Sequence, residues 1–196
     1  MAVSFGQENL EKLKSSIRDR VRQDYDGLSR TRLKRALLDK LSEIHTFPTP
    51  PTMVEIEFDS IWKRRQADID GGQIDKDEVG RSEDDLKAEY RSIAERRVRL
   101  GLLLAEVGRR NNIAVTDEEL KKAIVAEARR YPGYEHKVLE IFNNHPESAD
   151  RLRAPLFEEK TVNFILELVK TTERQVSIEE LSREADDEGN ASKETA

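Results

Sequence analysis

The sequence predicts an all-α fold: an elongated helical domain with a long N-terminal helix. Apolar residues recur three or four positions apart over long stretches, which is the helical period. Charged residues make up 38% of the chain and hydrophobic residues only 36%, so much of it must be solvated, as on long helices exposed to water. Residues 54–58 alternate like a strand, but their apolar positions also fit a helix.

The longest apolar stripe begins at Leu10 and ends at Ile44. It predicts one helix from about Gln7 to Ile44, roughly 55 Å long at 1.5 Å per residue. Prolines at positions 48, 50 and 51 end it, because proline has no amide donor and restricts the preceding residue. The stripe is longer than one small bundle covers, so we expect an elongated monomer or a weak homodimer.

Proline, glycine and capping residues mark the ends of the next two helices. Pro51 suits the first turn of a helix that ends at Gly71-Gly72, and residues 71–81 form an acidic, aperiodic loop. Ser82, followed by three acidic residues, caps the next helix. Residues 100–107 of that helix are apolar nearly all round, which assigns them to the core, and Asn111-Asn112 end it.

The last third of the chain contains shorter helices. Thr116 and Glu119 form a capping box for a helix that runs to Tyr131. After Pro132-Gly133 we expect helices at about 135–143, 147–153 and 155–170, and a final turn capped by Ser177. Residues 182–196 are acidic and polar, which predicts a disordered tail.

The sequence offers no catalytic, cofactor-binding or metal site. It has no cysteine, and His45, His136 and His145 lack metal-binding spacing. The glycine pair Gly71-Gly72 follows no strand and precedes no phosphate-binding lysine. Paired acids such as 84–85 and 118–119 lie in first helical turns, where the helix dipole accounts for them.

Composition also limits the partners. No run of 18 apolar residues and no secretory signal is present, so we expect a soluble protein that does not insert into membranes. The absence of cysteine fits the reducing cytoplasm. A net charge of −6 and a pI near 5.3 argue against direct nucleic-acid binding.

Several segments together resemble the C-terminal substrate-binding domain of trigger factors. Ala94-Glu95-Arg96-Arg97-Val98 followed by Leu100-Gly101-Leu102-Leu103-Leu104-Ala105-Glu106-Val107 is similar to a charged stretch that runs into an apolar seam in that family. Similar segments follow in the same order and spacing at 111–113, 116–120 and 156–162, and precede it at 28–41 and 50–54. The resemblance extends from about Phe5 to Leu181.

The resemblance implies a molecular chaperone that holds nascent or unfolded polypeptides in a cradle of helical arms. We expect residues 1–181 to be this domain, with arm regions at 48–80 and 132–153. The family's ribosome-docking and prolyl isomerase domains have no counterpart in the sequence, so isomerase activity and ribosome contact would belong to a longer parent protein. The resemblance also links the family to protein transport, the cell cycle and cell division.

Promiscuous binding needs apolar side chains exposed on a rigid scaffold, because apolar burial is non-directional. One group of candidates surrounds the Pro132-Gly133 break: Tyr131, Tyr134, Val138, Ile141 and Phe142. A second group follows the proline-rich linker: Met53, Phe58, Ile61 and Trp62. For each residue the alternative is an ordinary core position.

Two other functions stay open at this point. A coiled-coil or helical-bundle adaptor would bind one folded partner and ignore unfolded proteins. A prolyl isomerase would need a β-rich catalytic domain, and the sequence has no series of strand signals that could form one.

The predicted tail gives a first test. Deleting residues 182–196 should leave the melting temperature and client binding nearly unchanged, because this segment has no apolar period with which to pack. Thermal unfolding of the full and truncated chains checks this, and a loss of several degrees would show that the tail docks.

Overall fold

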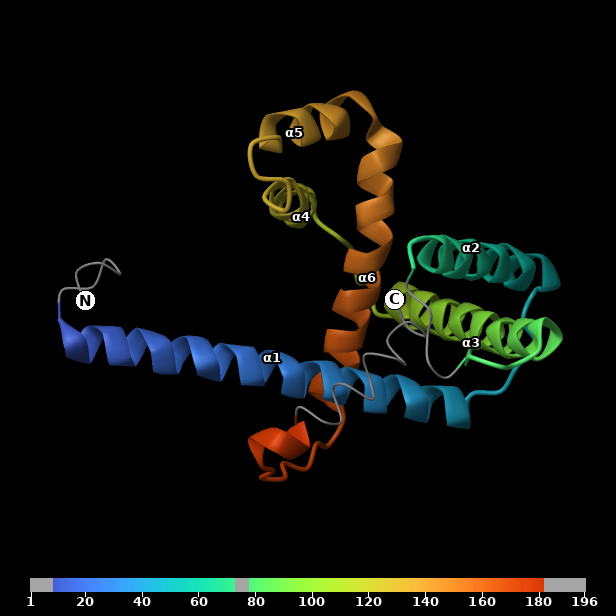
Figure 1. The fold of residues 1–196 in the computed structure, drawn as a ribbon, viewed down its shortest axis with the longest axis horizontal. Coiled ribbons are helices and arrows are strands. Elements are labelled where there is room, and N and C mark those ends of the chain that lie inside the picture. The colour runs from blue at the N-terminus through green and yellow to red at the C-terminus, as the bar shows by residue number, and fades with distance from the viewer. Residues whose placement is uncertain (1–8, 73–77, 182–196) are drawn as a thin grey trace. The chain divides into compact units, whose positions relative to one another are not determined.

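The computed structural model describes residues 9–72 and 78–181 and divides the chain into two compact units. Residues 1–44 and 171–196 form the first unit, which contains α1 (Leu10–Ile44). Residues 45–170 form the second, which contains α2 (Pro51–Asp70), α3 (Glu83–Arg110), α4 (Asp117–Ala128), α5 (Glu135–Asn144) and α6 (Pro146–Leu168) (Figure 1). The described ranges contain helices and no strand, so the predicted all-α class is confirmed. The predicted tail, residues 182–196, lies outside them.

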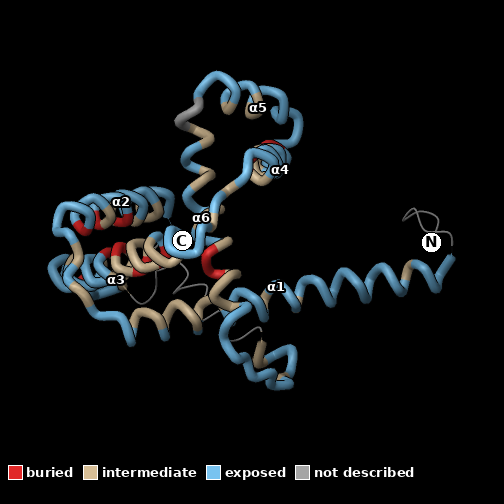
Figure 2. The backbone as a smooth tube through the Cα atoms, turned by 180° about the vertical axis from the view of Figure 1, so that it is seen from behind, coloured by how far each residue is buried: buried red, intermediate tan, exposed pale blue. Residues whose placement is uncertain are grey.

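In the first unit, α1 is a 35-residue helix with no buried residue (Figure 2). The Lys12 amide donates to Asn9 Oδ1 over 2.9 Å and so caps its first turn. Pairs of opposite charge along it, such as Arg20 with Asp24 at 3.4 Å, support an exposed helix only weakly. The predicted cap at Ser177 is also confirmed, because its Oγ accepts from the Glu180 amide over 3.1 Å.

In the second unit, α2 and α3 pack as an antiparallel pair around an apolar core. Val54, Phe58 and Ile61 of α2 are buried against Ala94 and Val98 of α3. Trp62 stacks on Phe58 with ring centroids 5.9 Å apart and meets the Tyr90 ring edge-on at 5.6 Å. The Ser82 cap predicted for α3 is present, since its hydroxyl accepts from the Asp85 amide.

The apolar seam of α3 is less uniformly buried than predicted. Leu100 and Leu104 are buried, and residues 101–103, 106 and 107 are half-buried. Ala105 is exposed because it lies beside an open groove rather than under another helix. The core assignment therefore holds for Leu100 and Leu104, holds only in part for the half-buried residues, and is wrong for Ala105.

Gly108 allows α6 to cross α3 closely. A Cβ atom at this position would lie 2.2 Å from Phe157 Cζ and 2.8 Å from Thr161 Oγ1, both on α6. Thr161 is fully buried, and its hydroxyl is satisfied because it donates to the Phe157 carbonyl over 2.9 Å. Any larger residue at 108 would have to push α6 away from α3.

The structure corrects two predicted boundaries. The helix capped by Thr116 ends at Ala128 and not at Tyr131. We expected separate helices at 147–153 and 155–170, but α6 is continuous and contains Pro155. Proline removes one backbone hydrogen bond from a helix interior, typically at a cost of about 3 kcal/mol. Contacts on both sides of the proline offset this cost: Arg153 bonds the Val115 carbonyl, and Phe157 packs on α3 at Gly108.

Two glycines of α3 give a matched test of the crossing. Gly108→Ala should destabilise the protein by about 1–2 kcal/mol, because overpacking against fully buried Thr161 outweighs the helix-propensity gain. Gly101→Ala meets nothing within 4 Å and should stabilise it by about 0.5–1 kcal/mol. Denaturant unfolding of both variants measures these changes, and shifts in the same direction would contradict the close crossing.

Candidate functional site

The candidate site lies on the α4–α5 arm, where α4 and α5 pack beside each other and beside α6 (Figure 1). The turn between the two helices, together with the start of α5, is exposed at every residue from 129 to 137 (Figure 2). No residue of α5 is buried. We refer to Tyr131, Tyr134 and Ile141, the exposed apolar residues of this region, as the arm-tip residues.

Local sequence builds the arm tip. Gly133 has a φ of 84°, a left-handed conformation that glycine adopts without steric cost. The Tyr134 amide donates to the Tyr131 carbonyl over 3.0 Å, which closes the turn between the helices. The turn therefore fixes Tyr131 and Tyr134 close together at the tip.

The five residues predicted on this arm divide into two sets. Tyr134 is 61% exposed, and Tyr131 and Ile141 are about half exposed. Val138 and Phe142 are half-buried, and α5 packs on both α4 and α6. One side of α5 thus attaches it to the arm, while the arm-tip residues remain open to a partner.

The residues predicted on α2 are mostly structural. Phe58 and Ile61 are only 8% and 7% exposed and belong to the α2–α3 core, so the alternative of an ordinary core position holds for them. Trp62 is half-buried and carries the Arg65 guanidinium 4.6 Å from its ring centroid. Only Met53 presents an open apolar side chain.

The sequence reasoning missed one exposed residue on α2. Ile56 is 66% exposed and follows Met53 by three positions, so the two share a face. The helical wheel places them away from Val54, Phe58 and Ile61, and that separation was the available signal. Both faces of α2 carry apolar residues, so the period alone did not indicate which face is buried.

An open groove of about 420 Å³ also escaped prediction. Its floor is made of small residues on α3 and α6, and its rim is partly charged: Gly101, Ala105, Val115, Asp150, Arg153, Ala154, Phe157 and Glu158. Partial desolvation of its carboxyl, and secondarily the charge of Glu57, raises the pKa of Glu158. The groove joins segments about 50 residues apart, and no local pattern reveals such a pairing.

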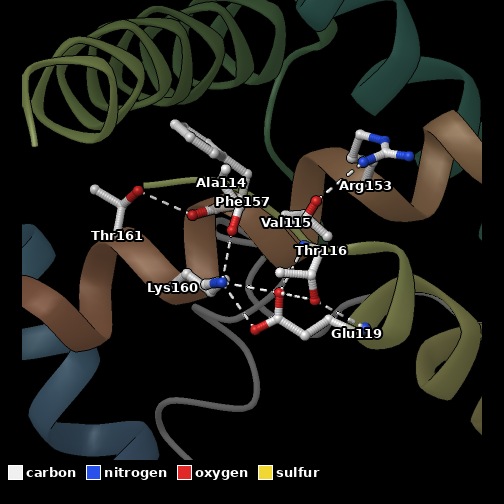
Figure 3. A network of polar contacts seen from close by, with 8 residues as sticks. All are labelled: Ala114, Val115, Thr116, Glu119, Arg153, Phe157, Lys160 and Thr161. Atoms are coloured by element: carbon white, nitrogen blue, oxygen red, sulfur yellow. Dashed lines mark hydrogen bonds and ion pairs between the residues drawn. The ribbon is translucent and has the colours of Figure 1, made fainter. Parts of the chain in front are cut away.

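A polar network ties the start of α4 to α6 (Figure 3). The Lys160 ammonium donates to both carboxylate oxygens of Glu119 over 2.8 Å and to the Ala114 carbonyl over 2.6 Å. The predicted capping box is confirmed: the Thr116 hydroxyl accepts from the Glu119 amide, and the Thr116 amide donates to the Glu119 carboxylate. One carboxylate therefore caps α4 and joins it to α6.

This network shifts the titration of its carboxylate. The hydrogen bond from Lys160, followed by those from the Thr116 amide and hydroxyl, lowers the pKa of Glu119 from 4.5 to about 2. Nearby, Arg153 donates to the Val115 carbonyl over 3.1 Å. Two cations of α6 thus hold consecutive carbonyls of the α3–α4 loop, which fixes the base of the arm.

The described residues contain no group of three or more His, Asp or Glu placed to hold a metal ion. Within the same ranges, no helix is long and apolar enough to cross a membrane.

Comparison with known proteins identifies the family. Residues 9–167 match the family described as "Bacterial trigger factor protein (TF) C-terminus". The chain belongs to the trigger factor C-terminal family. It is 55% identical to the trigger factor of Paramagnetospirillum magneticum over 95% of the chain and 40% of that protein. Identity to the trigger factor of Rhodospirillum centenum is 56%, over 96% of the chain and 42% of the relative.

The chain thus spans about two fifths of the length of these trigger factors. The matching family model describes the C-terminus, so the chain corresponds to that part and not to the isomerase domain. The resemblance inferred from residues 94–107 and the segments around them is confirmed.

The Glu119 network predicts a specific acid response. The folded pKa of Glu119, about 2, lies below its ordinary value of 4.5, so its carboxylate contributes stability that is fully present above pH 4.5. This contribution is lost as the pH falls from 4.5 towards 2. Glu119→Gln cannot show this loss, so the stability difference between parent and variant should be largest above pH 4.5 and should shrink below it.

Denaturant unfolding at pH values between 2.5 and 7 measures this difference, and subtracting the variant removes the titration of other carboxylates, such as Glu106, whose pKa is also about 2. A difference that does not depend on pH would contradict the ion pair with Lys160.

Proposed function

We propose that the chain is the part of a trigger factor that binds exposed apolar segments of nascent or unfolded polypeptides and prevents their aggregation. The observation that carries this proposal is the arm tip, where Tyr131 and Tyr134 in the α4–α5 turn and Ile141 on α5 remain exposed. Single exposed apolar residues are common on proteins, but here two lie in the α4–α5 turn and a third lies on α5, so one arm exposes all three.

The anchoring supports this function. Lys160 and Arg153 fix the α3–α4 loop to α6, and the half-buried side of α5 packs on its neighbours. A rigid surface loses little conformational entropy on binding, so weak apolar contacts still yield affinity. Because apolar contact is non-directional, the surface accepts many sequences.

We also propose that the chain functions as part of a longer protein. Isomerase activity and ribosome attachment would reside in the other parts of the trigger factor, and this part would act as a holdase in the cytoplasm without a cofactor. We expect it to be a monomer or a weak homodimer.

A second candidate is supported by α1. Leu10, Ile17 and Val21 are exposed on one face of this helix, a pattern that also suits an adaptor for one folded helical partner. Such an adaptor would not distinguish denatured from native proteins in general.

Aggregation suppression separates the two functions. A chemically denatured client is diluted with and without a near-stoichiometric amount of the chain, and light scattering is followed. A holdase suppresses scattering from several unrelated clients, whereas an adaptor leaves it unchanged, which would refute the proposal.

Exposed arm-tip residues should carry the binding. Tyr134→Ala and Ile141→Ala should each weaken binding of an uncharged unfolded client a few-fold, and the double variant should weaken it more. A fully buried apolar side chain contributes about 1–3 kcal/mol, but promiscuous binding distributes the energy over several sites. Fluorescence anisotropy at low and high salt measures the affinities, and apolar contact should persist at high salt.

Ile178→Ala is the matched control. Ile178 is 59% exposed, close to the 52% of Ile141, but lies in the other unit. It should bind clients like the parent. Equal losses for Ile141→Ala and Ile178→Ala would show that the arm tip has no special role, and circular dichroism verifies that each variant is folded.

A further inference from the structure

Two connections that lie side by side join the α4–α5 arm to the rest of its unit. One is the α3–α4 loop, residues 111–116, and the other is α6, which packs on α3 as well as on α4 and α5. Side chains of α6 bond the loop carbonyls of Ala114 and Val115, so the two connections are in contact (Figure 3). If the arm moves as one body, both connections must bend at this level.

Each connection contains a site at which the backbone bends easily. Pro155 has no amide hydrogen to donate within α6, and sharp bends in helices occur most often at proline. In the loop, Asn112 has a positive φ of 53°, which ends the path of α3, and residues 113–116 belong to no helix or strand. The structure thus places a possible pivot in each connection, and the two pivots adjoin.

The contacts of α6 differ on the two sides of Pro155. On its C-terminal side, Phe157 lies so close to α3 that a Cβ atom at Gly108 would be 2.2 Å from Phe157 Cζ. On its N-terminal side, α6 follows α5 in the chain, and Arg153 Nη2 lies 3.8 Å from Asp117 Oδ1 at the start of α4. The first part of α6 therefore belongs with the arm, and the second part belongs with α3.

Lys160 makes a contact that crosses this boundary. It lies in the second part of α6, but its ammonium donates over 2.8 Å to both carboxylate oxygens of Glu119, in the first turn of α4. It also donates over 2.6 Å to the Ala114 carbonyl of the loop. The Lys160 and Glu119 side chains are 33% and 39% exposed, so water can replace this contact at a modest cost in stability.

An open groove leaves room for the arm to turn. The groove of about 420 Å³ has Gly101 and Ala105 of α3 on one side and Ala154, in the first part of α6, on the other. A Cβ atom at Gly101 would meet nothing within 4 Å, and Ala105 is exposed. These small residues leave space between α3 and the part of α6 that belongs with the arm.

We propose that Lys160 is the latch of a hinged arm. Its contact with Glu119 holds α4 and α5 in their present orientation, and loss of this contact lets them turn about Pro155 and the α3–α4 loop towards α3. Lys160 is thus a positioning residue for the arm. The inference goes beyond the proposed function, because it concerns the orientation of the arm and holds whether or not the arm binds clients.

Spin labels measure this orientation in the full chain. The sequence has no cysteine, so Ser60→Cys on α2 with Glu140→Cys on α5 places one label on each side of the hinge, at exposed positions of one unit. Double electron–electron resonance should give a narrow distance distribution for this labelled parent. Lys160→Met should broaden the distribution and add shorter distances, while the melting temperature falls by no more than about 4 °C.

Three further variants separate a latch from an ordinary structural contact. Lys160→Arg should keep the narrow distribution, because a guanidinium can also bond both carboxylate oxygens. Arg110→Met is the matched control: Arg110 pairs with Glu106 of the same helix, Nε to Oε1 over 2.6 Å, so its loss should leave the distances unchanged. Ala105→Leu combined with Lys160→Met should remove the shorter distances, because the larger side chain fills the groove into which the arm turns.

The same distance measurements can overturn the proposal. A distribution for Lys160→Met that matches the labelled parent would show that Lys160 is no latch, and an equal change in Arg110→Met would show that any lost ion pair has this effect. If the shorter distances persist with Ala105→Leu, the arm does not turn towards α3 and the hinge is wrong. If Lys160→Met does not fold, Glu119→Gln decides: it removes the same charge pair and keeps a residue suited to the capping box, and an unchanged distribution in this variant would refute the latch.

Discussion

The crossing of α3 and α6 at Gly108 is the constraint on which the second unit depends. Because residue 108 has no side chain, Phe157 and the buried Thr161 lie directly on α3. The second half of α6 is thereby fixed to the helix that also forms the core with α2. The first half of α6 carries α5, so the arm is positioned by a contact distant from its tip.

The ionic contacts at the base of the arm act with this crossing rather than in place of it. Lys160 and Arg153 lie one on each side of Phe157 in the sequence, and both hold carbonyls of the α3–α4 loop. Exposed ion pairs contribute little to stability, but hydrogen bonds to loop carbonyls restrict the path from α3 to α4. Apolar packing thus supplies most of the stability, and the polar network supplies the geometry.

Features encoded locally could be predicted from the sequence, and features that depend on distant segments could not. The caps at Ser82 and Thr116 were predictable because each involves residues three positions apart. The continuity of α6 through Pro155 was not, because it depends on Val115 and Gly108, which lie about 40 to 50 residues away. At the candidate site, periodicity placed Ile141 on a helix and Tyr134 just before it. On α2, periodicity could not show that Phe58 is buried while Ile56 is exposed.

The two sides of α5 differ in what they contribute to the fold. Residues that contribute to packing, such as Val138 and Phe142, are half-buried, whereas Tyr134 and Ile141 contribute little to the folded state because they remain in water. The apolar surface of the tip is therefore not buried by folding and, under the proposed function, would be available to a client. Val138 and Phe142 therefore contribute to packing, whereas under the proposed function Tyr134, at the N-cap of α5, and Ile141 would contact the client.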